Sequence, residues 1–170
     1  MSAPTLTTDR LTLRGHHPDD LDALAAMWAE PGVYAMIGGK PRAREEVWIR
    51  LLRSIGQWAA FGYGAWVACD RVTGAVLGDI GLLESRRAIV PPLTAPETGW
   101  TLVPAAHGKG YANEAMRAVL DWADGQGLAR TCCIIDPGNV ASIRLAEKLG
   151  YGAPVDGVYQ DRRIRIFHRG

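Results

Sequence analysis

The sequence has too few cysteines, too unevenly placed, for a disulfide framework. There are three, an odd number, and Cys132 and Cys133 are adjacent in a β-prone run. Neighbouring strand residues point to opposite faces, so these two are not expected to bridge or to chelate together. The adjacent His16 and His17 have no partner four residues away and no nearby cysteine, so we expect no metal site.

The sequence also lacks an excess of charge of either sign. Nineteen lysines and arginines stand against eighteen aspartates and glutamates, for a formal net charge of +1. Such a chain has no broad basic field for nucleic acid, and we expect no nucleic-acid partner. Whatever the protein binds must be held by a local site.

Long apolar runs are missing as well. No stretch approaches a membrane span, and the first residues lack the basic segment and apolar core of a signal peptide. We therefore expect a cytoplasmic protein with no membrane partner. At 170 residues it is most simply a single domain, residues 1–170, as a monomer or homodimer.

The stretch from Trp100 to Tyr151 carries the strongest pattern. A strand-like run at 100–103 is followed by a glycine-rich turn at 107–110 and by a helix with apolar residues at three-and-four spacing. The first amides of a helix lack internal partners and, with the helix dipole, form a site for anions. Gly108 and Gly110 let the backbone approach a phosphate closely, and Lys109 adds charge at the rim.

A second strand and helix follow this turn. Residues 130–136 are β-prone, and Asn139 is a typical N-cap for a helix that ends at Gly150. We expect the apolar side chains of this helix to face inward, namely Val140, Ile143, Ala146 and Leu149. The unit is thus strand, phosphate turn, helix, strand, helix.

The flanking segments predict further strands and helices. We expect strands at 6–14, 62–69 and 74–83 and a closing hairpin after Tyr151, and helices near 19–28, 31–37 and 41–60. Residues 84–95 are expected to be irregular. Arg86 and Arg87 in this segment are interpreted as solvated loop charges, with contact to an anionic acceptor as the alternative.

Two motifs identify a family resemblance. His107-Gly-Lys-Gly-Tyr-Ala-Asn-Glu-Ala115 resembles the Q/R-x-x-G-x-G/A pyrophosphate loop of the GNAT superfamily of N-acetyltransferases, with histidine where the family has Gln or Arg. Asn139-Val-Ala-Ser142 and Glu147-Lys-Leu-Gly-Tyr151 resemble the N-x-x-S and K-L-G-F/Y signature of the branch that acetylates the amino termini of ribosomal proteins. The resemblance implies an α/β (α+β) fold with a mixed, mostly antiparallel sheet of six to seven strands flanked by about four helices.

The resemblance also implies the chemistry. Acetyl-CoA would be the cosubstrate, and its acetyl group would pass by direct attack to a primary amine, either a protein amino terminus or a small molecule. The expected acetyl-CoA contacts are Leu102, Val103, His107, Gly108, Lys109, Gly110, Tyr111, Ala112, Asn139 and Ser142. The N-cap role alone would explain Asn139.

Three side chains are candidates for catalysis. Glu97 lies at the mouth of the strand, where the resembled family has an acidic residue, so the resemblance implies that it is the leading base. A structural ion pair with an arginine is its alternative. Asp79 is the second base candidate, with a water-facing strand residue as its alternative. The resemblance places Ser142 near the leaving sulfur. Its hydroxyl is too weak an acid for full proton transfer, so we expect a hydrogen bond to the sulfur.

Two other classes of protein share part of this pattern. A dinucleotide-binding protein has support from the glycine turn and from Asp136 at the end of the next strand, but Asn113 occupies the third glycine position and too few residues follow. A CoA-binding sensor of the same fold without catalysis is the other alternative. No P-loop motif is present.

Overall fold

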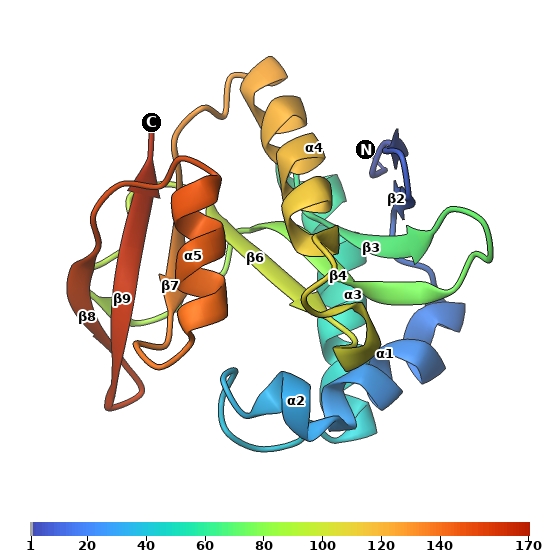
Figure 1. Ribbon diagram of the computed structural model, residues 1–170, viewed down its shortest axis with the longest axis horizontal. Coiled ribbons are helices and arrows are strands. Elements are labelled where there is room, and N and C mark those ends of the chain that lie inside the picture. The colour runs from blue at the N-terminus through green and yellow to red at the C-terminus, as the bar shows by residue number, and fades with distance from the viewer. Residues whose placement is uncertain (1) are drawn as a thin grey trace.

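The computed structural model describes residues 2–170, which form one sheet with helices on both faces (Figure 1). The helices are α1 (Leu21–Ala29), α2 (Pro31–Tyr34), α3 (Arg44–Phe61), α4 (Tyr111–Gly125) and α5 (Val140–Lys148), with 3-10 turns at Pro18–Asp20 and Pro104–Ala106. The strands are β1 (Leu6–Thr7), β2 (Leu11–Arg14), β3 (Ala65–Asp70), β4 (Val76–Leu83), β5 (Ile89–Val90), β6 (Glu97–Leu102), β7 (Thr131–Ile135), β8 (Val155–Tyr159) and β9 (Arg162–Arg169). None of the helices in this part of the chain has the length and apolar character that crossing a bilayer requires.

The sheet is mixed and mostly antiparallel, which confirms the predicted fold class. Residues 2–170 form nine strands in the order β1-β2-β3-β4-β6-β7-β9-β8-β5, more than the six or seven predicted. The first predicted strand is a hairpin of β1 and β2, because Thr8 and Leu11 bond to each other and turn the chain. The segment predicted to be irregular contributes β5, which pairs with β8.

The sheet opens in its middle, between β6 and β7. This pair is parallel and has a single register pair, Glu97 opposite Cys132, whereas all six residues of β6 pair with β4 on its other side. The last bonds across the opening are from Cys132 N–H to the Pro96 carbonyl, at 3.0 Å, and from the Thr98 hydroxyl to the Cys132 carbonyl, at 3.2 Å. Figure 1 shows β6 and β7 diverging beyond this point, so residues 99–102 keep one backbone edge free of a neighbouring strand.

Alternating side chains of the strands build a core on each face of the sheet. The larger cluster joins Trp66 and Ile80 to the apolar stripe of α4, and the smaller one joins α1 and α3 around Trp28. Figure 1 shows α4 and α5 on the near side of the sheet and α3 behind it. Trp28 and Trp58 are both 2 % exposed and belong to these cores.

The caps of α4 and α5 follow the predicted pattern, with one exception in the packing of α5. Gly110 precedes α4 in the left-handed region, and the Asn139 side chain accepts the Ser142 N–H at 3.1 Å, as an N-cap does. Val140, predicted to face inward, is 53 % exposed. That prediction was wrong because Val140 is the first helical residue and no element of residues 2–170 covers it.

Candidate active site

The turn before α4 offers unused backbone donors. Gly108 and Gly110 have φ values of 70° and 80°, where a side chain would be strained. Within residues 2–170 none of the amides of residues 108–112 donates a hydrogen bond, and the first helical bond runs from Glu114 N–H to the Gly110 carbonyl. These amides and the helix dipole fit the phosphates of an anionic ligand.

A clamp from the amino-terminal hairpin fixes this turn. The Arg10 guanidinium donates to the Lys109 carbonyl at 2.9 Å and to the Glu114 carboxylate at 2.6 Å, and it lies 4.2 Å from the centroid of the Tyr111 ring. Burial would raise the pKa of Glu114, but the hydroxyl of Thr8 and the donors of Arg10 outweigh it and hold that pKa below its usual value. This clamp could not be predicted from the sequence, because Arg10 is about a hundred residues from Lys109 and Glu114 and belongs to no common motif with them.

The free edge of β6 leads away from the turn. Val103 N–H donates to the Leu77 carbonyl in β4 at 2.8 Å, so its amide serves the sheet. Because successive strand residues alternate in bond direction, the N–H and C=O groups of Leu102 and Trp100 point to the side that β7 has left. His107 donates from Nε2 to the Leu102 carbonyl at 2.8 Å and so ties the turn to this edge.

Ser142 faces β6 across the opening. Trp100 donates from its indole nitrogen Nε1 to the Ser142 hydroxyl oxygen at 3.2 Å, while the Asn139 cap fixes the first turn of α5. The hydroxyl hydrogen of Ser142 remains available for another acceptor. Trp100 is a residue of this site that sequence reasoning missed, since an aromatic residue within a strand gives no sign of the partner it will meet.

Glu97 lies buried at the start of β6. It is 4 % exposed, forms an ion pair with Arg87, and accepts the Ser85 hydroxyl at 2.8 Å. Arg87 also lies 4.9 Å from the centroid of the Tyr159 ring. The interpretation of Arg87 as a solvated loop charge was therefore wrong, because this side chain folds inward over the strand; Arg86, by contrast, is largely exposed.

Asp79 lies on β4, opposite Thr101 of β6. Its side chain is 18 % exposed and lies 3.3 Å from Nε2 of the fully buried His16, so it does not simply face water. Burial would raise the pKa of Asp79, but His16 and the more distant Arg50 outweigh it and hold that pKa below its usual value.

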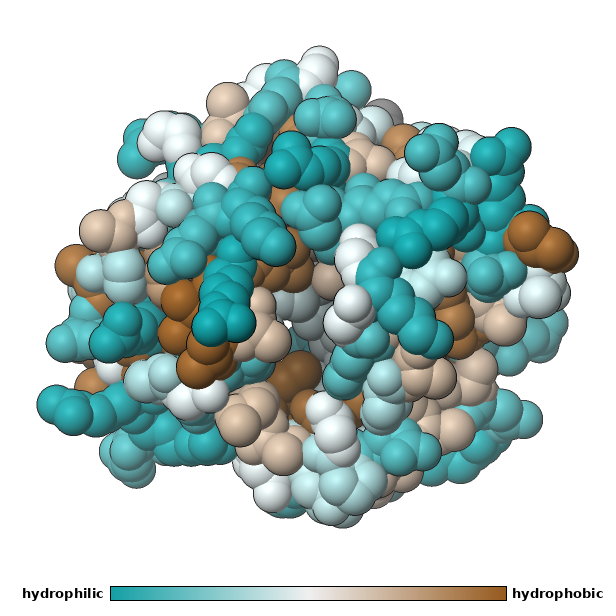
Figure 2. Space-filling view, in the orientation of Figure 1, coloured by the Kyte–Doolittle hydropathy of each residue, from teal (hydrophilic) through white to brown (hydrophobic). Residues whose placement is uncertain are grey.

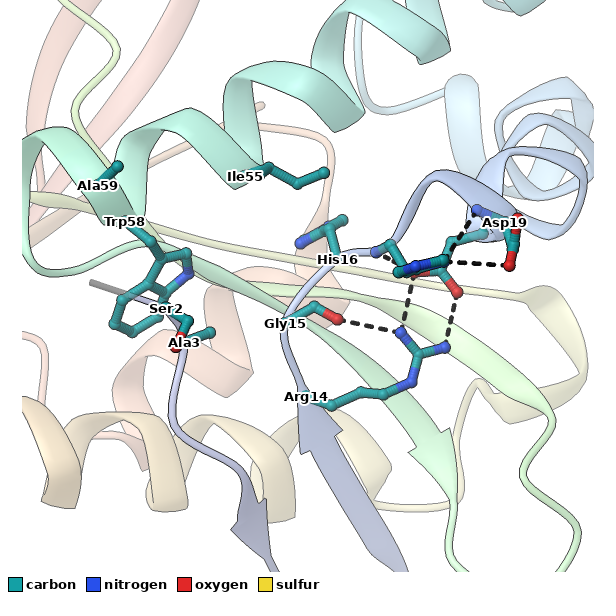
Figure 3. A pocket seen from close by; sticks show the side chains of 11 residues that line it. Ser2, Ala3, Arg14, Gly15, His16, Asp19, Ile55, Trp58 and Ala59 are labelled. Atoms are coloured by element: carbon teal, nitrogen blue, oxygen red, sulfur yellow. Dashed lines mark hydrogen bonds and ion pairs between the residues drawn. The ribbon is translucent and has the colours of Figure 1, made fainter.

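Most of the predicted site residues thus lie beside the opening between β6 and β7. The 108–112 amides, the free edge of β6 and Ser142 border the opening, and Figure 2 shows the surface hollowed near its centre, between α5 and β6. A separate pocket beside β2, lined by Arg14, His16 and Trp58 among others, contains none of the predicted site residues (Figure 3). In the described chain, no three His, Cys, Asp or Glu side chains are grouped to hold a metal ion.

The free edge of β6 beside unused amides fits an extended, phosphate-bearing donor such as acyl-CoA, and the match to a family of acyltransferases gives the class. Residues 10–152 match the acetyltransferase (GNAT) domain. The chain is 35 % identical over 156 residues to the uncharacterized protein YkkB of Bacillus subtilis, covering 88 % of this chain and 87 % of that one. This chain belongs to the GNAT family and is an acetyl-CoA-dependent acetyltransferase, which confirms the resemblance.

Solved structures share the whole fold. An acetyltransferase from Agrobacterium tumefaciens has 31 % identity and a TM-score of 0.84, covering 100 % of this chain and 96 % of its own. A putative GNAT-family acetyltransferase from Bordetella pertussis has 29 % identity and a TM-score of 0.87, covering 99 % and 100 %. The dinucleotide-binding alternative is wrong, because that fold needs a parallel sheet and only β6 and β7 are parallel in residues 2–170.

Proposed function

We propose that this enzyme transfers the acetyl group of acetyl-CoA to a primary amine within a ternary complex. The amine nitrogen forms the new bond to the carbonyl carbon, the carbon–sulfur bond breaks, the amine proton passes to a protein base, and CoA leaves as a thiolate that takes up a proton from water. The observation that carries the proposal is the free edge of β6 at residues 99–102, which lies between the turn with the unused amides at 108–112 and Glu97 at the start of the strand.

Backbone groups do most of the donor binding in this proposal. The amides of residues 108–112 hold the paired phosphates, and the outward-facing groups of Trp100 and Leu102 bond the pantetheine arm. A backbone N–H of this edge that donates to the acetyl carbonyl oxygen stabilises the negative charge that develops on this oxygen when the amine attacks. Ser142, held by Trp100, directs its hydroxyl hydrogen to the leaving sulfur.

Glu97 is the proposed base. Arg87 and Ser85 each occupy one carboxylate oxygen, and each oxygen keeps a further lone pair that can accept the amine proton. Asp79 is the second candidate. Its lowered pKa makes it a weak proton acceptor at neutral pH.

The acceptor is a protein amino terminus or a small amine. Fold relatives include a protein named as ribosomal-protein-S5-alanine acetyltransferase from Vibrio fischeri, at 17 % identity and a TM-score of 0.73. An α-amino group, with a pKa of about 8, needs less help from a base than a lysine amine at about 10.4. N-terminal acetylation is therefore one form of the proposed reaction.

A panel of amines and peptides, assayed for acetyl-CoA-dependent thiol release, tests the proposal. Glu97→Gln should lower kcat on the best acceptor by on the order of a hundredfold, while Glu84→Gln, at a carboxylate outside the site, should leave it nearly unchanged. Equal effects would remove Glu97 as the base. Tight binding of CoA with no turnover on any amine would favour the sensor of the same fold instead.

A further inference from the structure

In the part of the chain that the structure describes, three arginines just before and within α3 form no ion pair; Arg42 and Arg50 are partly buried, and Arg53 is exposed. In residues 2–170, the guanidinium groups of Arg42, Arg50 and Arg53 make no hydrogen bond or ion pair. The Nε atoms of Arg42 and Arg50 are buried as well as unbonded. Buried donors without partners are costly, so an unpaired group of this kind calls for a ligand that completes it.

Two of these arginines share one aromatic ring. The guanidinium carbons of Arg42 and Arg50 each lie 4.7 Å from the centroid of the Trp28 ring, which is 2 % exposed. Stacking on the indole fixes both planar groups in place. It leaves their N–H edges free, and these edges match the geometry of a carboxylate or phosphate.

The neighbouring carboxylates are already engaged. Glu97 pairs with Arg87, Asp79 lies against His16, and Glu46 caps the first turn of α3. Each of the three therefore has a partner of its own. The cluster of Arg42, Arg50 and Arg53 keeps an excess of positive charge.

Burial and the surrounding arginines weaken the hold of Arg50 on its proton. Desolvation has the largest effect, and the positive charges of Arg42, Arg53 and Arg87 add to it. Asp79 acts in the opposite direction, and the net result is that the pKa of Arg50 is lowered to about 10. Arg50 stays charged at neutral pH. The folded chain therefore keeps a desolvated cation among like charges.

The geometry points to an acceptor amine that also carries an anionic group, a carboxylate or a phosphate, held by Arg42, Arg50 and Arg53. This inference rests on the proposed amine acetylation and names the substrate class for the same site. The cluster lies on the face of the sheet to which Asp79 points, because α1 and α3 pack there around Trp28. Glu97 is on the same face, since it lies four residues before Thr101, the register partner of Asp79.

The donor's phosphates do not explain the cluster. Ile80 packs in the core shared with α4, so its neighbour Asp79 points to the other face of the sheet, where α1 and α3 lie. Arg50 acts on Asp79 from that face, whereas the free amides at 108–112 are at the start of α4. Donor and acceptor thus have separate anion sites.

Matched amines test this inference. β-Alanine is compared with β-alaninamide, and O-phosphoethanolamine with ethanolamine, by thiol release with wild type, Arg50→Met, Arg50→Lys and Arg44→Met. The structure predicts a kcat/KM for one or both anionic amines that exceeds the matched neutral amine by on the order of tenfold or more. Arg50→Met should abolish that preference and Arg50→Lys should retain part of it. Arg44, in the same helix but paired with Asp22 and exposed, is the control.

Binding is measured separately by titrating O-phosphoethanolamine and β-alanine into the CoA-loaded protein in a calorimeter. Binding to wild type but not to Arg50→Met, without thiol release, keeps the anion site and contradicts the amine acetylation. Equal turnover of anionic and neutral amines, or equal loss on both in Arg50→Met, overturns the anion site and leaves the acetylation in place. A rise in the KM for acetyl-CoA alone in Arg50→Met would assign the cluster to the donor and overturn the inference.

Discussion

Trp100 donates a hydrogen bond to Ser142 at 3.2 Å and so joins β6 to α5 across the opening in the sheet. The hydrogen bond from the Thr98 hydroxyl to the Cys132 carbonyl is the last one between β6 and β7. The Trp100–Ser142 bond lies beyond it, where these two strands have already separated. Since the indole can only donate, it fixes Ser142 as an acceptor toward Trp100 and leaves the hydroxyl hydrogen to point elsewhere.

Trp100→Phe should therefore act through Ser142. We expect Trp100→Phe and Ser142→Ala each to lower kcat by about tenfold, the value of one lost hydrogen bond, and the double variant to lose no more than either alone. Steady-state kcat and KM for acetyl-CoA measure this, with Trp48→Phe as the control. Multiplied losses in the double variant would show that the two residues act independently.

In the turn at 107–110, changing the backbone conformation should weaken CoA binding far more than removing a side chain. Gly110→Val should abolish CoA binding, because φ is 80° and a branched side chain would distort the amides that follow. His107→Ala should weaken CoA binding modestly, by about fivefold, since it removes one bond to the Leu102 carbonyl. Calorimetry with CoA, supported by circular dichroism to check folding, compares the two. Equal losses in well-folded variants would contradict a site led by backbone donors.

Removing the charge of Arg50 should stabilise the fold. Desolvation and the like charges around it lower its pKa to about 10, so at neutral pH the folded state holds a cation that the unfolded state solvates better. Arg50→Met should raise Tm by about 2–4 °C, which corresponds to an increase on the order of 1 kcal/mol in the free energy of unfolding. The Tm difference between Arg50→Met and wild type should become smaller as the pH rises past about 10, because Arg50 of the folded wild type then loses its proton. Thermal denaturation against pH measures it.

Arg44→Met is the matched control for that measurement. Its exposed pair with Asp22 is expected to contribute less than about 1 kcal/mol. A Tm for Arg50→Met at or below that of wild type would mean that the stacking on Trp28 outweighs the cost of the buried charge.

The Arg14–Asp20 pair predicts a pH-dependent contribution to stability. Arg14 donates two bonds to the Asp20 carboxylate, at 2.6 and 2.9 Å, and Asp20 is 5 % exposed (Figure 3). Burial would raise the pKa of Asp20, but Arg14 and the His17 N–H outweigh it and lower it. Asp20→Asn should cost about 3 kcal/mol at neutral pH.

The sign of the pH dependence follows from that lowered pKa. In the unfolded state Asp20 has a pKa of 3.8, so as the pH falls the unfolded state takes up the proton before the folded state does. Wild type is therefore more stable than Asp20→Asn by the full difference in the free energy of unfolding above this pH. The difference disappears as the pH falls through the lower pKa of the folded state. Urea denaturation of both proteins at several pH values measures the difference. A difference that stayed constant down to pH 2 would assign the effect to packing.

Local sequence determined the elements that this enzyme is built from. The glycines at 108 and 110, the spacing of α4 and the Asn139 cap each depend on contacts within a few residues, so their structure could be predicted from the chain alone. The family followed from two such motifs in order. The extra strands were missed, because β5 exists only by pairing with the distant β8.

Tertiary structure decided how the charged side chains were used. From the sequence, Glu97 was either a base or the partner of an unspecified arginine, and Arg87 was interpreted as a loop charge. The folding of the 84–95 segment over β6 makes Arg87 that partner. The sequence did not predict the cluster of Arg42, Arg50 and Arg53. An arginine in or near a helix has the same sequence pattern whether its side chain is solvated or packs against a buried indole, as Arg42 and Arg50 do. Backbone propensity is local, whereas desolvation and charge pairing depend on what the completed fold places nearby.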